Sequence, residues 1–480
     1  MKENKLKTKS IDMDNGTSEK KTIKSINPAN NQVVKEYPVM DDREVKNIIQ
    51  QADKAFREWK KQSFAKRAEL LNKVAALMRE RKNELARLCS VEMGKVFNQG
   101  IWEVELCANI YEYYAANGEK LLQDTPLDTP QGKAFVAYEP MGTILSVQPW
   151  NFPFYQVVRS SAPHIMAGNT YVLKHSSNVP QCADAIHQIF KDAGAPEGVF
   201  SNLFIPGSKV DELIDYPEIK GVTFTGSEAA GRKIAAASGE AIKKHVLELG
   251  GSDPLVVLDD ADLDMAVKLA SMGRLANAGQ VCTSPKRIII MEQIADQFIA
   301  QAKAIYENVK VGDPLAADTQ LGPLVTEEAM LQVLKQVDDT VKAGATLVYG
   351  GERIGENSAF MKPTILTGIK EGMVAYSEEI FGPVLAVYAV KDEEEAIKLA
   401  NDVSFGLGGT VIGKDEERAI SVARRIDTGM VFINQVTGTA PELIFGGTKN
   451  SGYGRELSRE GMLEFVNHKL IRISSPDLPY

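Results

Sequence analysis

The stretch Val222-Thr223-Phe224-Thr225-Gly226-Ser227-Glu228-Ala229-Ala230-Gly231 indicates the class of fold. Residues 222–225 form a β-type run that ends at Gly226, and Ser227 then begins an alanine-rich segment. Serine favours the start of a helix, so the pattern predicts a strand followed directly by a helix. The free amides and the dipole at such a helix start attract phosphate. The fingerprint Gly-x-Gly-x-x-Gly is absent, so an ordinary strand-to-helix turn is an equally good interpretation of this stretch alone.

Strands and helices alternate on both sides of this stretch. The other strands expected around it lie within 133–149 and over 171–174, 199–205, 246–249 and 255–258, with a helix over 179–193. A second block has expected strands over 287–291, 346–349, 381–389, 409–412 and 431–434, and helices over 293–308, 327–343, 393–401 and 416–426. This alternation predicts an α/β fold of parallel sheets covered by helices on both faces. Two successive blocks predict two domains with an active site between them.

The N-terminal part of the chain has a different pattern. Turn residues between short β-type runs predict a hairpin over 25–38. Apolar residues at helical spacing predict helices from 41 to about 59 and over 65–81, 84–93 and 101–118. Residues 1–24 lack the apolar centre of a signal peptide, so we expect a mobile arm there. The last apolar run, 470–474, predicts a strand used in contacts between subunits.

The composition argues against several classes of protein. With 480 residues, 44% hydrophobic and 25% charged, the chain is ordinary for a soluble globular protein of two or three domains. A formal net charge of −9 argues against a nucleic-acid partner, and no apolar run is long enough to span a membrane. The four cysteines and five histidines are scattered, so neither a metal site nor a disulfide framework is expected. A cytoplasmic location fits this cysteine usage.

Cys282 is the candidate nucleophile. It lies among small and polar residues in Gly279-Gln280-Val281-Cys282-Thr283-Ser284, and Lys286 and Arg287 follow it closely. Nearby positive charge favours the thiolate, which is the reactive form of cysteine. Most free cysteines are instead small buried hydrophobic residues, and that interpretation remains open for an isolated cysteine.

Glu248 and Asn151 are the other candidates for chemistry. Glu248 is a single acid in an apolar strand, where burial would raise its pKa and suit it to act as a general base. Neutralisation by Lys243 or Lys244 is the competing interpretation. Asn151 lies between two prolines, where a stiff turn would hold its amide as a donor to an oxyanion. An ordinary Asx turn is the alternative for Asn151.

The order of these motifs resembles that of the aldehyde dehydrogenase superfamily. The resemblance covers about residues 26–469 and includes the motifs at 149–153, 247–251, 279–282, 379–383, 445–447 and 449–456. It implies an α/β fold with two Rossmann-like parallel-sheet domains plus a small β oligomerisation arm. The implied parts are an NAD(P)-binding domain over 25–252, interrupted near 124–143 by part of the arm, a catalytic domain over 253–445, and a return segment with the C-terminal oligomerisation strand over 446–480. Such proteins are homodimers or homotetramers.

The resemblance also implies roles for individual residues. Cys282 matches the nucleophile, Glu248 the general base and Asn151 the oxyanion donor, which the backbone N–H of Cys282 completes. The residues that match cofactor contacts are Trp150, Lys174, Ser176, Ser177, Gly226, Ser227, Leu249, Glu379 and Phe381. In the implied reaction the thiolate attacks an aldehyde, hydride passes to the nicotinamide, and Glu248 activates the water that releases a carboxylic acid.

A narrower resemblance is to bacterial NAD(P)-dependent succinate-semialdehyde dehydrogenases. It rests on the motifs at 174–179, 158–159 and 250–254. The substrate of those enzymes is a short aldehyde with a distal carboxylate. An arginine such as Arg159 would bind both oxygens of this carboxylate with its guanidinium group. Phe445 is a second expected substrate contact. A structural salt bridge is an equally good interpretation of Arg159, and some members carry a second arginine where this chain has Ala276.

The choice of nicotinamide cofactor depends on Ser177. Many relatives that prefer NAD have glutamate here, whose charge would repel a 2′-phosphate. Ser177 is small and neutral, and Lys174 would attract the phosphate. We therefore predict that NADP is accepted, alongside NAD.

Other functions compete with this prediction. A broad-specificity aliphatic aldehyde dehydrogenase would use the same catalytic residues. A CoA-acylating enzyme has less need of Glu248, and a cysteine hydrolase needs a histidine base that no motif supplies. A binding or structural relative without activity would not need Cys282, Glu248 and Asn151 together.

Overall fold

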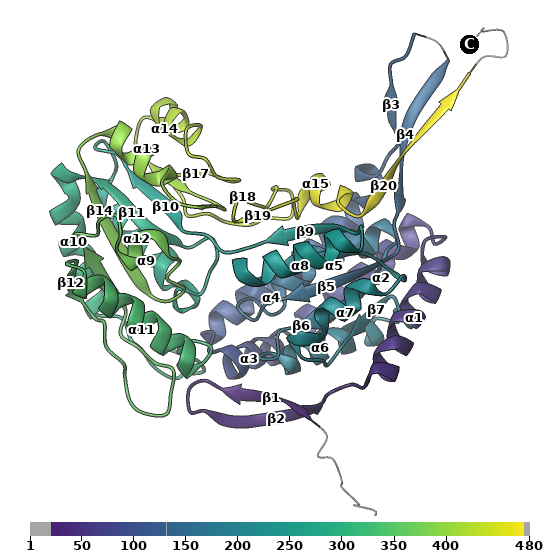
Figure 1. The fold of residues 1–480 in the computed structure, drawn as a ribbon, viewed down its shortest axis with the longest axis horizontal. Coiled ribbons are helices and arrows are strands. Elements are labelled where there is room, and N and C mark those ends of the chain that lie inside the picture. The colour runs from purple at the N-terminus through teal and green to yellow at the C-terminus, as the bar shows by residue number, and fades with distance from the viewer. Residues whose placement is uncertain (1–20, 131, 475–480) are drawn as a thin grey trace, which may run out of the picture.

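The computed structural model describes residues 21–130 and 132–474, and Figure 1 shows their arrangement. The chain begins with the predicted antiparallel hairpin, formed by β1 (Thr22–Asn27) and β2 (Gln32–Pro38). Because Ile23 is buried and Thr22 pairs with Pro38, residues 22–24 belong to the hairpin, and their assignment to a mobile arm is wrong. Residues 1–20 of that predicted arm lie outside the described residues.

Four helices follow the hairpin and confirm the helical spacing in this part of the chain. They are α1 (Asp42–Trp59), α2 (Phe64–Glu80), α3 (Lys82–Met93) and α4 (Phe97–Leu121). The Asp41 carboxylate accepts a hydrogen bond from the Glu44 N–H at 2.8 Å, and the Glu44 carboxylate accepts one from the Asp41 N–H at 2.8 Å. This reciprocal capping satisfies free amides at the helix start and explains where α1 begins.

A six-stranded sheet carries the first α/β block, in the order β19-β9-β8-β5-β6-β7. Its parallel strands are β5 (Thr143–Gln148), β6 (Thr170–His175), β7 (Phe200–Asn202), β8 (Ile219–Thr225) and β9 (Lys244–Glu248), and β19 (Gly452–Tyr453) is antiparallel. The intervening helices are α5 (Tyr155–Ala167), α6 (Pro180–Asp192), α7 (Val210–Asp215) and α8 (Glu228–Glu240). The chain moves outward from β5 through β6 and β7, then returns to the other side of β5 with β8. Open α/β sheets bind ligands at such a switch point.

Helix α5 was not predicted from the sequence. All 13 of its residues are buried, including Pro163, so the helix has no polar face and no helical alternation. The Glu103 carboxylate, on α4, accepts hydrogen bonds from the backbone N–H groups of Phe154 at 2.8 Å and Tyr155 at 3.0 Å. A residue distant in sequence therefore caps this helix.

A seven-stranded sheet carries the second block, in the order β12-β13-β14-β11-β10-β16-β17. Its parallel strands are β10 (Asp253–Val257), β11 (Pro285–Met291), β13 (Thr364–Thr367), β14 (Val384–Val390), β16 (Thr410–Ile412) and β17 (Phe432–Ile433), and β12 (Thr346–Tyr349) is an antiparallel edge. Its helices are α9 (Leu263–Leu275), α10 (Glu292–Glu307), α11 (Glu327–Lys342), α12 (Val374–Ser377), α13 (Glu393–Asn401) and α14 (Glu416–Ala423). The predicted α/β class with parallel sheets is confirmed. The boundary at 252/253 falls between β9 and β10, and the domain division itself stays a prediction.

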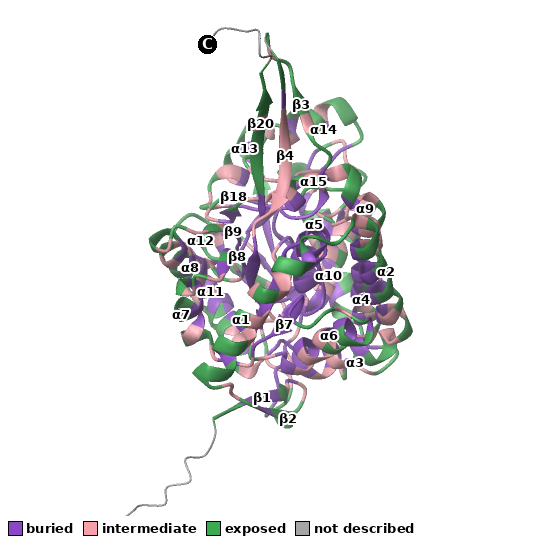
Figure 2. Ribbon diagram, turned by 90° about the vertical axis from the view of Figure 1, so that its right-hand side faces the viewer, coloured by how far each residue is buried: buried purple, intermediate pink, exposed green. Residues whose placement is uncertain are grey.

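A three-stranded antiparallel sheet projects from this body, as Figures 1 and 2 show. Its strands are β3 (Thr125–Leu127), β4 (Lys133–Pro140) and β20 (Val466–Ile473), in the order β20-β4-β3. The short strands β15 (Phe405–Gly406) and β18 (Thr448–Lys449) pair with each other, and α15 (Ser458–Leu463) precedes β20. Strand β20 begins before the predicted 470–474, and residues 475–480 lie outside the described residues. Within the described ranges, no helix has the length and apolar character needed to cross a membrane.

Candidate active site

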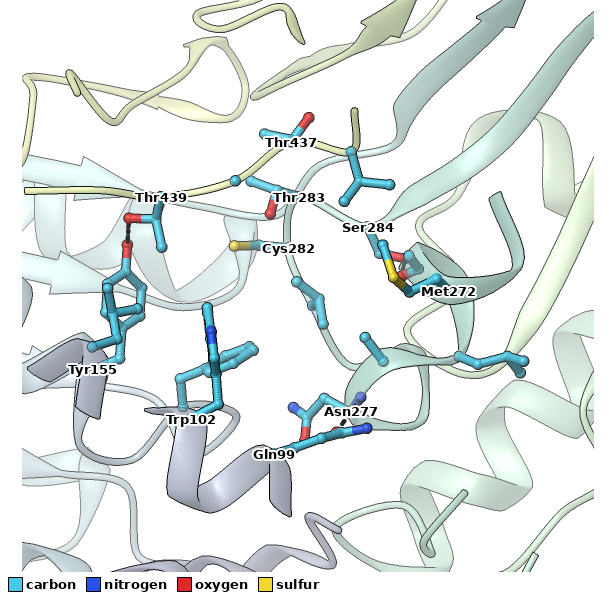
Figure 3. Close-up of a pocket in the computed structure, with 18 of the residues that line it drawn as sticks. Gln99, Trp102, Tyr155, Met272, Asn277, Cys282, Thr283, Ser284, Thr437 and Thr439 are labelled. Carbon is cyan, nitrogen blue, oxygen red and sulfur yellow. Dashed lines mark hydrogen bonds between the residues drawn. The ribbon is translucent and has the colours of Figure 1, made fainter. Parts of the chain in front are cut away.

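A cavity of about 820 Å³ receives side chains from both α/β blocks, and Cys282 is on its wall (Figure 3). The lining is apolar or polar without charge: Asn98, Gln99, Trp102, Leu106, Phe152, Tyr155, Gln156, Met272, Gly273, Leu275, Ala276, Asn277, Val281, Cys282, Thr283, Ser284, Pro285, Gln320, Val436, Thr437, Gly438, Thr439 and Phe445. The sulfur of Cys282 points into the space bordered by Trp102, Tyr155 and Thr439. The Tyr155 and Thr439 hydroxyls are hydrogen-bonded at 2.7 Å. The cavity therefore offers a thiol and uncharged hydrogen-bonding groups.

The thiol of Cys282 is partly exposed, whereas the other three cysteines are buried. Burial of the sulfur raises its pKa to about 11, although the charges of Arg159 and Lys286 lower it. The thiol is therefore protonated at neutral pH in this arrangement. As expected, the positive charge of Lys286 favours the thiolate, but desolvation of the sulfur raises the thiol pKa by more than this charge lowers it.

The two cations that follow Cys282 have different partners. Lys286 Nζ donates hydrogen bonds to the backbone carbonyls of Val281 at 2.9 Å and Cys282 at 2.7 Å. It also pairs with the Glu379 carboxylate at 3.1 Å. Arg287 points elsewhere and donates to the carbonyl oxygens of Ser252, Leu399 and Ala400. Lys286 is therefore the cation that contacts the loop of the nucleophile.

The backbone before Cys282 is left-handed over Asn277, Ala278 and Gly279, with φ values of 51°, 54° and 74°. Residues other than glycine rarely adopt this region, so surrounding contacts must hold the turn. Asn277 Nδ2 donates to the carbonyl of Asn151 at 2.8 Å. The fully buried Arg274 donates to the carbonyl of Gly279 at 3.3 Å. The nucleophile thus follows a turn that both blocks of the chain hold in place.

Glu248 ends strand β9 and is 2% exposed. Neither carboxylate oxygen has a hydrogen-bond partner within the described residues. Burial raises the pKa of Glu248 to about 8, although Arg159 opposes this shift. A Cβ at Gly446 would lie 2.9 Å from Glu248 Oε1, so this glycine leaves space beside the carboxylate. The raised pKa predicted from the sequence is confirmed.

Neutralisation of Glu248 by the nearby lysines does not occur. Lys243 Nζ donates to the backbone carbonyls of Ile214 and Tyr216. Lys244 pairs with Glu464 at 3.0 Å. Both lysines therefore have other partners, and Glu248 keeps its unpaired carboxyl group.

Asn151 is 4% exposed and lies against the loop that carries Cys282. Its Nδ2 donates to the carbonyl of Gln280 at 3.1 Å, and its Oδ1 accepts from Gln156 Nε2 at 3.4 Å. The backbone N–H of Cys282 donates to none of the described residues. The structure therefore brings the predicted amide donor to the segment of the predicted nucleophile.

Arg159 is fully buried on α5 and does not line the cavity. Its guanidinium forms an ion pair with Glu456, and its Nη2 donates to Thr225 Oγ1 at 3.2 Å. The guanidinium carbon lies 4.2 Å from the ring centroid of Phe445, which does line the cavity. The prediction that Arg159 binds a substrate carboxylate directly is therefore wrong. Arg159 instead forms a structural ion pair behind Phe445.

We expect Arg159→Met to lower the free energy of unfolding by about 3–5 kcal/mol, because it leaves the buried Glu456 carboxylate without its partner. Chemical denaturation measures this loss. The double variant Arg159→Met/Glu456→Gln is the matched control, and it should recover much of the stability. The opposite result would be a stable Arg159→Met protein whose KM rises only for an aldehyde that carries a carboxylate. That result would show that Arg159 binds the substrate carboxylate after all.

The predicted cofactor contacts gather at the carboxyl ends of parallel strands. Trp150 follows β5, Ser176 and Ser177 follow β6, and Gly226 and Ser227 follow β8. The Ser227 hydroxyl accepts from the Ala230 N–H at 3.4 Å and caps α8. The start of that helix is therefore presented at the switch point of the sheet.

Lys174 supplies a buried cation at the same edge. It is 6% exposed, and burial lowers its pKa to about 8. Its ammonium group has no hydrogen-bond or ion-pair partner in the part of the chain that the structure describes. A cation without a partner at the same sheet edge as a helix N-terminus fits the phosphates and ribose of a dinucleotide.

Glu379 and Phe381 approach this edge from the second block. The Phe381 ring meets the Trp150 ring edge to face, with centroids 5.8 Å apart. A Cβ at Gly250 would lie 2.2 Å from Glu379 Oε2, so only glycine permits this approach. Leu249, just before that glycine, is buried. The predicted cofactor residues therefore come together across the two blocks.

Several residues of this region were not singled out from the sequence. Trp102, Tyr155 and Thr439 line the cavity, and Glu456 pairs with Arg159. Asp253 is 2% exposed below the Cys282 loop. The signal for Glu456 was its place in the 449–456 motif, and that for Asp253 was its place in the 250–254 motif. Trp102, Tyr155 and Thr439 had no signal, because they come from three separate segments.

Residues 15–471 match the aldehyde dehydrogenase family. The chain therefore belongs to this family, as its motifs predicted. It is 46% identical over 448 residues to a succinate-semialdehyde dehydrogenase [NADP(+)] of Deinococcus radiodurans, covering 93% of this chain and 94% of that protein. It is 44% identical over 452 residues to a probable succinate-semialdehyde dehydrogenase [NADP(+)] of Synechocystis sp., covering 94% of this chain and 100% of that protein.

Solved structures share the fold. Succinic semialdehyde dehydrogenase from Streptococcus pyogenes, in complex with NADP+, has a TM-score of 0.93 and 42% identity, covering 94% of this chain and 100% of that one. The structure of Gox0499 has a TM-score of 0.93 and 45% identity, with the same coverage of 94% and 100%. The two-sheet α/β architecture is therefore that of solved aldehyde dehydrogenases.

Proposed function

We propose that this protein oxidises succinate semialdehyde to succinate with NADP or NAD. The observation that carries the proposal is the partly exposed Cys282 thiol on the wall of a cavity in an aldehyde dehydrogenase fold. The choice of aldehyde is supported by relatives with 42–46% identity that are named for succinate semialdehyde and NADP.

The proposed chemistry assigns one role to each polar group around the thiol. The Cys282 thiol first gives its proton to solvent, and the sulfur then attacks the aldehyde carbon and forms a thiohemiacetal. The Asn151 amide and the backbone N–H of Cys282 donate to the oxygen that becomes negative. Glu248, whose carboxylate is unpaired and buried, takes a proton from the water that hydrolyses the thioester.

The residues at the strand ends fit a dinucleotide cofactor. The Ser227-capped helix start and the unpaired ammonium of Lys174 would bind its phosphates and ribose. Trp150, Phe381 and Glu379 would hold the nicotinamide end. When bound, the nicotinamide accepts the hydride that leaves the thiohemiacetal.

Uncharged donors would have to bind the distal carboxylate, because no charged side chain lines the described cavity. Candidate donors are Trp102, Gln156 and the linked hydroxyls of Tyr155 and Thr439. Neutral hydrogen bonds to a carboxylate still discriminate against a substrate that lacks it.

The test compares succinate semialdehyde with butanal, which has the same chain length and no carboxylate, each with NADP and with NAD. We expect kcat/KM to be at least about tenfold higher for the semialdehyde. Formation of reduced nicotinamide, followed by absorbance, gives both values. Oxidation of butanal at an equal or higher rate would refute the assigned substrate.

A broad-specificity aliphatic aldehyde dehydrogenase is the second candidate. The size of the cavity, about 820 Å³, favours it, as does an apolar lining that includes Leu106, Phe152 and Val436. Efficient oxidation of several neutral aldehydes of different length would support it.

For the cofactor, we expect Ser177→Glu to lower the NADP-to-NAD ratio of kcat/KM by at least about tenfold, because a carboxylate there repels a 2′-phosphate. Ser177 is exposed after β6, so the substitution disturbs no core packing. Initial rates with each cofactor measure the ratio. The control Ser177→Gln introduces a side chain of the size of glutamate without its charge, and it should keep the original cofactor preference. An equal change of the NADP-to-NAD ratio in both variants would mean that size rather than charge decides.

We also propose that the projecting sheet joins subunits into a homodimer or homotetramer. Its strand β20 exposes Leu470 (62%) and Ile473 (54%), which are apolar and would be covered by another copy. Light scattering of the full chain measures the oligomeric state. A cytoplasmic location stays a prediction.

A further inference from the structure

Three ionisable side chains converge beneath the loop that carries Cys282. They are Asp253 at the start of β10, Lys286 on β11, and Glu379 in the loop before β14. Asp253 is 2% exposed and Lys286 is 4% exposed. No side chain among the described residues donates a hydrogen bond to Asp253, and the Gly408 backbone N–H faces its carboxyl group. Burying charges without full pairing lowers the stability of a protein, so a functional role for this cluster is worth testing.

The Lys286 ammonium contacts two carbonyl oxygens of the Cys282 loop and the carboxylate of Glu379. Its Nζ lies 2.9 Å from the carbonyl oxygen of Val281, 2.7 Å from that of Cys282 and 3.1 Å from Glu379 Oε1. The cation therefore fixes the peptide that follows the nucleophile. It also places a positive charge within the same buried region as the sulfur.

Asp253 also lies close to the loop that carries Cys282. A Cβ at Gly251 would lie 2.7 Å from Asp253 Oδ1 and 3.0 Å from the Cys282 carbonyl oxygen. A Cβ at Gly408 would lie 2.6 Å from Asp253 Oδ2 and 3.1 Å from Thr437 Oγ1, which belongs to a cavity residue. The carboxyl group therefore lies close to both the Cys282 loop and the cavity residue Thr437.

We propose that Lys286 is a positioning residue that holds the Cys282 loop and stabilises the thiolate, and that Asp253 controls this effect through its own charge. The proposal rests on the proposed function only in taking Cys282 as the nucleophile. When Asp253 is neutral, the Lys286 charge is opposed by Glu379 alone. When Asp253 is ionised, a second negative charge opposes formation of the thiolate.

The charges that face Cys282 come from four elements. Arg159 on α5 and Lys286 on β11 lower the pKa of the thiol, while Asp253 on β10 and Glu379 before β14 raise it. The Tyr155 hydroxyl on α5 is a further titratable group near the sulfur. Burial raises the pKa of Asp253 to about 7, so its charge changes near neutral pH.

The test is the rate of Cys282 alkylation by iodoacetamide as a function of pH, without cofactor or aldehyde. The other three cysteines are buried, and Cys282→Ala supplies the blank. We expect Lys286→Met to slow alkylation about tenfold near pH 8, because loss of the cation raises the thiol pKa. Lys286→Arg should restore much of the rate.

Asp253→Asn should have the opposite effect. We expect alkylation to become about three to ten times faster above about pH 8, and unchanged below about pH 6, where Asp253 is already neutral. This dependence of the rate change on pH distinguishes an effect of the Asp253 charge from a general loosening of the loop, which would change the rate at every pH. It also keeps the proposal testable if Lys286→Met does not fold.

Lys243→Met is the matched control, because Lys243 also donates to two backbone carbonyls but lies away from Cys282. It should leave the alkylation profile unchanged. An unchanged profile in folded Lys286→Met, an equal slowing in Lys243→Met, or slower alkylation in Asp253→Asn would each overturn the proposal. Alkylation needs no aldehyde, so failure of the proposed substrate would leave this result intact.

Discussion

Replacing Cys282 by alanine is expected to abolish aldehyde oxidation, with a loss of at least about 10⁴-fold in kcat. The described residues that line the cavity include no second thiol, and the neighbouring Ser284 hydroxyl donates to the Gly273 carbonyl at 2.9 Å. The substitution removes one partly exposed sulfur atom and leaves the backbone contacts of the loop in place. The variant should therefore still fold and bind the cofactor.

Two measurements check this expectation: reduced nicotinamide formed with aldehyde present, and cofactor binding by fluorescence titration. Cys182→Ala is the control, because Cys182 is a fully buried cysteine of α6 outside the cavity lining. It should keep its turnover after any loss of stability is taken into account. Turnover by Cys282→Ala would show that another group forms the bond to the aldehyde.

Glu248→Gln is expected to slow the reaction strongly after the first turnover. Attack by Cys282 and hydride transfer do not need the carboxylate, but hydrolysis of the thioester needs a base for the water. We expect a burst of roughly one reduced nicotinamide per active site, followed by a steady rate about 10²–10⁴-fold lower. Stopped-flow absorbance resolves the two phases.

The pH dependence supplies a second test of this role. The base is active when ionised, and burial raises the pKa of Glu248 to about 8, so steady turnover should rise with pH up to about that value and then level off. The Glu248→Gln variant should lose this rise. If the variant lacked a burst but kept a normal steady rate, the base would have to be assigned to another group.

Many elements of the fold were predictable because their residues carry a local signal. The helix that begins at Asp42 follows a capping pair, Asp41 and Glu44, which is visible in the sequence. The strand-to-helix turn at Gly226 and Ser227 has its expected form. Helix α5 was missed because every residue in it is buried, so its sequence has no periodic contrast.

Residues of the candidate site were predictable only where a short motif contained them. Cys282, Glu248 and Asn151 each stand in such a motif, and the fold brings Asn151 to the loop that leads to Cys282. The cavity wall was not predictable, since Trp102, Met272 and Thr437 belong to distant segments. Their only relation is that folding places them around one space.

The sequence by itself determined the family, the parallel α/β architecture and the set of reactive groups, because short motifs and periodic patterns are local. Tertiary structure alone decided how those groups behave. It buried Arg159 against Glu456 and turned Lys286, but not Arg287, toward Cys282. It also raised the pKa of Cys282 to about 11 and that of Glu248 to about 8. The reason is that desolvation and charge pairing depend on neighbours that folding brings from distant parts of the chain.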